Sequence, residues 1–188
     1  MLMQFQQKDV KVGFVNIVPQ ISDSSKDLDF CYAGSSEEAI GAQLAEAMSP
    51  GLKDGAKICV ICLPYGQDNA AGRLKGLQDW FAANRPDVEI LAEESGEWST
   101  EKGMTITENL LQKYPDLDAI ISQNDNMALG AIEAIAGAGK TGDVIVVGVD
   151  AIPDAIQAVK DGTMAMTVLN DGPSMGRTMY DVILKLIA

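Results

Sequence analysis

Two kinds of hydrophobic pattern follow one another along the chain. Short continuous apolar runs, many of them β-branched, predict strands that are covered on both faces. They occupy residues 10–15, 30–33, 58–63, 88–92, 119–122, 144–149 and 164–169. Apolar residues at helical spacing lie between most of these runs, over residues 36–48, 68–84, 99–114, 127–136, 154–160 and 173–188. This order predicts an α/β fold, a three-layer, doubly wound parallel sheet with helices on both faces.

Capping residues set the expected start of three helices. Ser36 precedes two acidic residues, which is typical of a helix N-terminus. Asp68 or Asn69 is expected to cap the next helix, and Trp98 and Ser99 to open the one after it. The helices then alternate with strands over short connections, which predicts a parallel sheet with helices on both faces.

Five polar or aromatic residues follow the predicted strands and are candidates for a binding site. They are Arg73, Trp98, Asn124, Asp150 and Asn170. Because ligands of open α/β sheets bind beyond the carboxyl ends of the strands, we expect the five to share one rim. Each also has a structural explanation: a surface arginine, an aromatic packed at a helix start, two helix N-caps and a turn former.

Taken together, these side chains suit a neutral polyol. A carboxylate accepts hydrogen bonds from adjacent hydroxyls, whereas a guanidinium donates to ring and hydroxyl oxygens. Trp98 offers a flat apolar surface for the C–H face of a pyranose. The five contain no pair of nucleophile and base. The set therefore predicts a protein that binds its ligand and is not an enzyme.

Composition narrows the function classes further. The net charge is −13, with 27 acidic against 14 basic residues, and the cations form no basic patch, which argues against binding to nucleic acid or anionic membranes. Histidine is absent, which removes the commonest general base. No apolar run approaches the roughly 18 residues that span a bilayer. The first residues lack the pattern of a signal peptide.

Two motifs with chemical potential have simpler explanations. Cys59 and Cys62 match a CxxC pattern, but they lie in an apolar run where their side chains are expected on opposite faces of a strand. We expect buried, unreactive thiols. The glycines of residues 137–142 follow a helix and precede a strand, the reverse of a phosphate loop. No cofactor is predicted.

Most of the chain from Val12 onward resembles the type I periplasmic sugar-binding proteins, the receptors of ABC importers. The resemblance rests on FVNIVP, YAGSSEEA, GQDNAAGRLKG, EWSTEKGM, QND-x-MALGA, VVGVDA and TVLND. The last two are most similar to galactose/glucose receptors. The family implies a flavodoxin-like lobe, and it assigns Arg73, Trp98, Asn124, Asp150 and Asn170 as sugar contacts.

The resemblance also implies where this chain departs from the family. Gln67 and Asn69 stand where galactose/glucose receptors place a histidine and an aspartate, so they are expected to be weaker ligand contacts. The calcium loop of those receptors is missing, so no structural metal is expected. Family members have two lobes. Residues 1–29 are expected to be a remnant strand and hinge of an N-terminal lobe, 30–170 the C-terminal lobe, and 171–188 a hinge crossing and a helix of the N-terminal lobe.

Three hypotheses follow. The first is a truncated substrate-binding protein of a sugar ABC transporter. It would bind a monosaccharide, dock on an ABC permease, work in the periplasm or anchored outside the cell, and self-associate as a homodimer through orphaned apolar surface. The second is the effector domain of a sugar-responsive repressor of the LacI type. The third, an enzyme on a flavodoxin-like scaffold, is disfavoured because histidine, a phosphate loop and an elbow serine are missing.

Overall fold

The computed structural model describes residues 4–5, 7–8, 10–17, 19 and 30–187. The chain divides into two compact units. The larger is residues 36–170, and the smaller is formed by residues 1–35 and 171–188. Residues 20–29, which belong to the segment 1–29 of the sequence analysis, lie outside the described part.

The larger unit contains a five-stranded parallel sheet with the strand order β4-β3-β5-β6-β7. Its strands are β3 (Lys57–Cys62), β4 (Glu89–Ser95), β5 (Ala119–Ser122), β6 (Ile145–Val149) and β7 (Met166–Val168). Its helices are α2 (Glu37–Met48), the short 3-10 helix η2 (Ser49–Gly51), α3 (Asp68–Asn84), α4 (Thr100–Lys113), α5 (Asp125–Gly137) and α6 (Pro153–Lys160). The predicted α/β fold class is confirmed.

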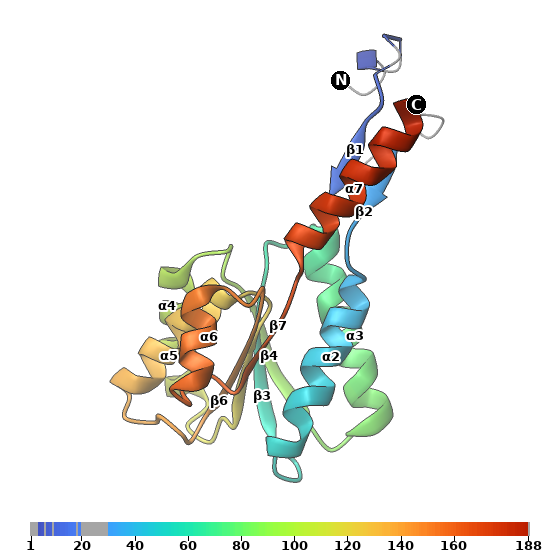
Figure 1. The fold of residues 1–188 in the computed structure, drawn as a ribbon. Helices are drawn as coiled ribbons and strands as arrows, with labels where there is room; N and C mark the ends of the chain where they lie inside the picture. Colours follow the sequence, from blue (N-terminus) through green and yellow to red (C-terminus); the bar gives the residue numbers. More distant parts are fainter. Residues whose placement is uncertain (1–3, 6, 9, 18, 20–29, 188) are drawn as a thin grey trace. The chain divides into compact units, whose positions relative to one another are not determined.

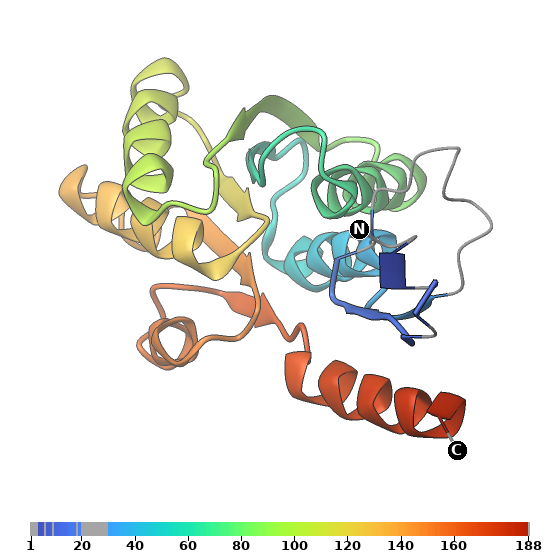
Figure 2. The same cartoon turned by 90° about the horizontal axis from the view of Figure 1, so that it is seen from above.

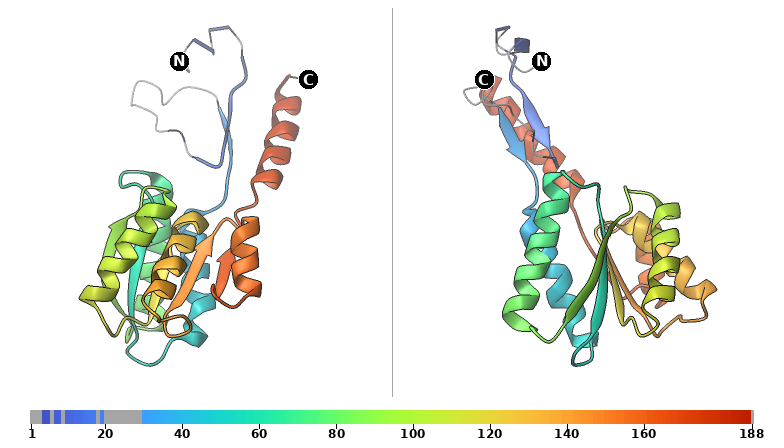
Figure 3. Two further views of the ribbon diagram at one scale, coloured as in Figure 1. Left: turned by 90° about the vertical axis from the view of Figure 1, so that its left-hand side faces the viewer. Right: turned by 180° about the vertical axis from the view of Figure 1, so that it is seen from behind.

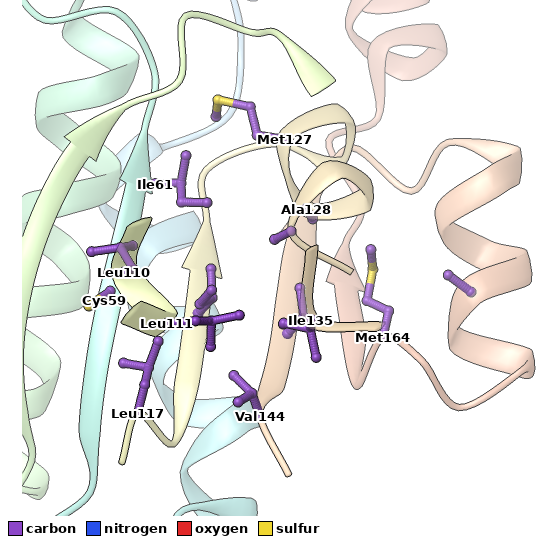
Figure 4. Packing of buried hydrophobic residues seen from close by; sticks show 14 of the residues in the cluster. Cys59, Ile61, Leu110, Leu111, Leu117, Met127, Ala128, Ile135, Val144 and Met164 are labelled. Carbon is purple, nitrogen blue, oxygen red and sulfur yellow. The ribbon is translucent and has the colours of Figure 1, made fainter. Parts of the chain in front are cut away.

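Helices cover both faces of this sheet. Helices α2 and α3 pack together on one face, and α4, α5 and α6 lie on the other (Figure 1, Figure 2). Each face has its own hydrophobic cluster, because alternate side chains of the central strands point to opposite sides. Figure 4 shows the cluster under α4 and α5, where Ile61 of β3 lies near Met127 of α5.

The CxxC pair lies in the central strand β3. Cys59 belongs to the cluster under α4 and α5, whereas Cys62 belongs to the cluster under α2 and α3. Both thiols are free and buried. Burial raises the pKa of Cys59 to about 11 and that of Cys62 to about 12, and thiols of such high pKa are poor nucleophiles. The side chains are structural, as expected.

Helix starts differ in detail from the sequence expectation. The N-cap of α3 is Gln67 and not Asp68 or Asn69, so both of these residues lie inside the first turn. Helix α5 begins at Asp125, two residues before the predicted start, because the side chain of Asn124 caps it. The apolar periodicity of a helix begins only after its N-cap, so a prediction from periodicity places the start of the helix too far along the chain.

The smaller unit is a two-stranded parallel sheet with one helix. Strands β1 (Gly13–Val15) and β2 (Cys31–Ala33) pair in register, and helix α7 (Gly172–Ile187) packs along both (Figure 3). The Sγ atom of Cys31 lies 3.4 Å from Sδ of Met179 in α7. A Cβ atom on Gly13 would meet the same sulfur, so glycine permits this close packing.

Candidate binding site

The carboxyl ends of the five parallel strands meet at one edge of the larger unit. The register pairs Cys62 of β3 with Ser95 of β4, and Val149 of β6 with Val168 of β7. The chain passes from β3 outward to β4 and then returns to β5 on the other side of β3. This reversal is a topological switch point, the usual ligand position of such sheets.

Arg73 is an almost fully buried cation at this edge, with 2% of its surface exposed. Its Nε donates to Oε2 of Glu37 at 2.7 Å, and Nη1 donates to the backbone oxygen of Gln123. The guanidinium therefore joins α2, α3 and the residue after β5. Arg73 was predicted from the sequence and Glu37 was not, because the only sequence signal of Glu37 is its place in an acidic first helical turn.

Asp150 follows β6 and adopts a left-handed backbone conformation, with φ of 117°. Burial raises the pKa of its carboxyl group above the ordinary value. The guanidinium of Arg73 and a hydrogen bond with Asn170 oppose this rise, whereas the charge of Glu37 adds to it. The structure thus brings four residues together, and we call them the polar cluster: Glu37, Arg73, Asp150 and Asn170.

A fully buried carboxyl group, Asp125, supports the loop that carries Asp150. Its Oδ2 accepts from the backbone N–H of Ile152 at 3.0 Å, and its Oδ1 accepts from the hydroxyl of Thr167 at 2.7 Å. That hydroxyl accepts in turn from the N–H of Ala151. Burial raises the pKa of Asp125 to about 6. These bonds hold a loop in which Asp150 and Ala151 both have positive φ.

Gln123 is a second residue of this edge that was not predicted from the sequence. Its side chain is 1% exposed and joins two elements. Oε1 accepts from the N–H of Leu63 at 2.9 Å, and Nε2 donates to the oxygen of Ala70 at 3.0 Å. Gln123 therefore connects the end of β3 to the first turn of α3. A polar side chain directly after an apolar strand was the only available signal.

Asn124 lies at the same edge as the N-cap of α5. Its Oδ1 accepts from the N–H of Met127 at 3.0 Å, so the structural explanation for this residue holds. The side chain is 1% exposed. Because capping uses the oxygen, the amide NH2 is the group with which Asn124 can donate to a ligand.

Gln67 is the N-cap of α3, and Asn69 lies in the first turn of this helix. Asn69 is buried, and its Oδ1 lies 2.9 Å from the N–H of Ala70. The Oε1 atom of Gln67 is buried and has no hydrogen-bond partner among the described residues. Unpaired buried acceptors are costly. This atom is therefore suited to accept a hydrogen bond from a ligand.

Trp98 occupies the turn between β4 and α4. The turn is placed by Gly96, whose N–H donates to the oxygen of Cys62 at 3.0 Å. A Cβ on Gly96 would lie 2.5 Å from Sδ of Met127, so the turn sits against the start of α5. Trp98 itself has φ of 66° and is 37% exposed. Its indole is the large apolar surface of this turn.

The arrangement offers hydrogen-bond donors and acceptors around one edge of the larger unit. Among the described residues, no three His, Cys, Asp or Glu side chains are grouped to hold a metal ion. No helix in the described part of the chain is both long and apolar enough to cross a membrane.

Comparison with known families agrees with this geometry. The profile of the periplasmic binding protein domain matches residues 1–188, the full chain. The chain belongs to this family. A solved structure supports the assignment: an ABC transporter periplasmic solute-binding protein from Actinobacillus succinogenes, with bound D-allose, has a TM-score of 0.93 and 28% identity. The match covers 99% of this chain and 66% of that protein.

Curated family members are similar over most of this chain. The ribose import binding protein of Salmonella typhimurium is 34% identical over 154 residues, 81% of this chain and 51% of its own length. The D-allose-binding periplasmic protein of Escherichia coli is 33% identical over 141 residues, 74% of this chain and 45% of its own. The chain thus spans about half the length of these relatives. The closer similarity to galactose/glucose receptors stays a prediction.

Proposed function

We propose that residues 36–170 supply one wall of a monosaccharide-binding cleft in a solute-binding protein of a sugar ABC importer. The observation that carries the proposal is the hydrogen-bonded pair of Asp150 and Asn170 beside Arg73, at the carboxyl edge of a family member's sheet. Sugar hydroxyls donate and accept at once, and this edge offers both functions.

The remaining predicted contacts extend this wall. The amide of Asn124 and the unpaired Oε1 of Gln67 add a donor and an acceptor. Asn69 adds a second amide. Trp98 contributes an aromatic surface on which the C–H face of a sugar ring can stack.

The receptor hypothesis is preferred over the repressor hypothesis because one relative is named as a ribose import binding protein and another as a D-allose-binding periplasmic protein. On this proposal the intact protein works in the periplasm, or anchored at the outer surface of the cell, and docks on an ABC permease. Residues 1–29 and 171–188 would belong to the partner lobe of that protein.

The test is a titration of the isotopically labelled chain with D-ribose, D-allose and D-galactose, followed by NMR. Since one wall makes only part of the contacts, we expect dissociation constants in the millimolar range, if each missing hydrogen bond costs about 1 kcal/mol. Shifted resonances should map to the polar cluster and to Trp98.

Asp150→Ala and Trp98→Ala should each abolish these shifts. Asp143→Ala is the matched control, because Asp143 is an exposed carboxylate before β6. Sugar-induced shifts that survive in Asp150→Ala would contradict the site. Micromolar affinity of the chain alone would contradict the claim that it supplies a single wall.

We also propose that the smaller unit drives homodimerisation. Tyr180, Leu184 and Ile187 are exposed by 65%, 43% and 64% and recur at helical spacing on α7. Such an apolar stripe favours association. Light scattering at high concentration should show a dimer that Leu184→Lys weakens, whereas the exposed substitution Lys75→Glu on α3 should leave it unchanged. A strictly monomeric wild type would exclude this partner.

A further inference from the structure

Glu37 is a partly buried carboxylate whose partner is already part of the proposed site. Its side chain is 13% exposed, that of Arg73 is 2% exposed, and the two atoms Oε2 and Nε lie 2.7 Å apart. Both charged groups lose hydration when they are buried, and this desolvation cost offsets much of the attraction between them. The ion pair is therefore weak evidence for a role in stability, and a role in the binding site accounts for it better.

Close packing of two helices places this pair. A Cβ atom on Gly41 of α2 would lie 2.0 Å from the backbone oxygen of Arg73, and one on Gly76 of α3 would lie 1.9 Å from the oxygen of Glu38. A Cβ on Gly72 would lie 2.7 Å from Cβ of Glu37. Glycine at these positions lets the α2 and α3 backbones touch. The contact sets Glu37 directly against the guanidinium.

Two consequences follow for the guanidinium of Arg73. Its orientation is fixed, because Glu37 and the oxygen of Gln123 accept two of its five N–H donors. Glu37 also balances the positive charge of Arg73 within the wall. The carboxylate of Asp150 then adds a negative charge that no cation of the polar cluster balances, since the cluster holds two acids and one base.

We propose that Glu37 is a positioning residue that orients Arg73 and gives the wall a net negative charge. The wall then takes neutral and amino sugars and rejects sugars that carry a carboxylate or a phosphate. The inference rests on the proposed function, and it adds a residue and a charge class to it. Without Glu37, the wall would lose one negative charge, and the Nε donor of Arg73 would become available to an anionic group, a use for which arginine is well suited.

The first test needs no ligand. Glu37→Gln should lower the pKa of the Asp150 carboxyl group in an NMR titration, because the charge of Glu37 raises it. Glu38→Gln is the matched control: Glu38 is the next residue, is 57% exposed, and lies 3.4 Å from Lys75 on the surface. Equal behaviour of the two variants would overturn the role of Glu37.

The second test compares D-glucose, D-glucosamine and D-glucuronate on the wild-type chain and on Glu37→Gln. The wild type should bind glucuronate at least about tenfold more weakly than glucose, and glucosamine at least as well as glucose. Glu37→Gln should strengthen glucuronate relative to glucose and weaken glucosamine. A merely structural role would change all three in the same direction.

The outcomes separate the two proposals. If ribose, allose, glucose, glucosamine and glucuronate all leave the wild-type spectrum unchanged, the proposed function fails. The pKa of Asp150 in Glu37→Gln then still shows whether Glu37 acts on the polar cluster. If sugars bind but the ratio of glucuronate to glucose is the same in wild type, Glu37→Gln and Glu38→Gln, the charge inference is wrong and the proposed function stands.

Discussion

The hydroxyl of Thr167 donates to Oδ1 of Asp125 at 2.7 Å, which joins β7 to the first turn of α5. Through the N–H of Ala151, which donates to Thr167 at 3.1 Å, the pair also holds the loop after β6. Asp150 lies on that loop with a positive φ. The backbone of a predicted sugar contact is therefore stabilised by a carboxyl group that is itself fully buried.

Asp125→Ala should destabilise the larger unit. The substitution leaves the N–H of Ile152 and the hydroxyl of Thr167 without their acceptor, and we expect a loss of about 3 kcal/mol in the free energy of unfolding. Urea denaturation at pH 7 measures it. Asp143→Ala, which removes an exposed carboxylate, should change stability by less than about 0.5 kcal/mol. Equal effects of the two variants would contradict the role of Asp125.

The stabilising contribution of Asp125 should depend on pH. Its pKa is about 6 in the folded protein and about 3.9 in an unfolded chain. The folded state therefore binds the proton more tightly, so the part of the contribution that depends on protonation is largest below about pH 4 and is lost as the pH rises through 6. The hydrogen bonds that Asp125 accepts persist at pH 7 and are what Asp125→Ala removes there. The full span is about 3 kcal/mol as an upper bound.

The measurement for this pH dependence is the difference in free energy of unfolding between wild type and Asp125→Asn, from urea titrations at pH 4, 5, 6 and 7. Asparagine does not titrate, and groups that do not interact with Asp125 cancel in the difference. Asp150 does not cancel fully, because its charge contributes to the raised pKa of Asp125. The advantage of the wild type should shrink with rising pH. A difference that stays constant or grows with pH would show that the pKa of this carboxyl group is not raised in the folded protein.

Gly76→Ala should disrupt the packing of α2 on α3. The new Cβ would lie 1.9 Å from the backbone oxygen of Glu38, and a backbone atom cannot move aside as a flexible side chain does. We expect a loss of about 2–3 kcal/mol in thermal or urea unfolding. Gly137→Ala at the end of α5 is the control, because nothing lies within 4 Å of its added Cβ. That variant should be neutral or gain up to about 1 kcal/mol.

The three thiols should differ in reactivity. Cys59 and Cys62 are buried with raised pKa values of about 11 and 12, so the folded protein should leave both unlabelled by a thiol reagent at pH 7.5. Cys31 is half-buried and should be labelled first. Intact mass after brief labelling, with a urea-unfolded sample as the full-labelling control, counts the modified sites. Rapid labelling of Cys59 or Cys62 would contradict the buried placement.

The sequence by itself determined the fold class and the edge at which to look for a ligand. Continuous apolar runs such as 119–122 and 144–149 predict buried parallel strands from local pattern alone. Parallel strands place their carboxyl ends together, so the sequence alone predicts Asn124 and Asp150 at one edge. Both inferences depend on residues that are close in the chain.

Tertiary structure decided which side chains meet. Glu37 and Arg73 are joined only because glycines let α2 and α3 approach, and Asp125 and Thr167 only because β7 pairs beside β6. Local periodicity carries no information on contacts between residues far apart in sequence. The physical reason is that such pairs are brought together by packing of whole elements, whereas pattern and capping act within a few residues.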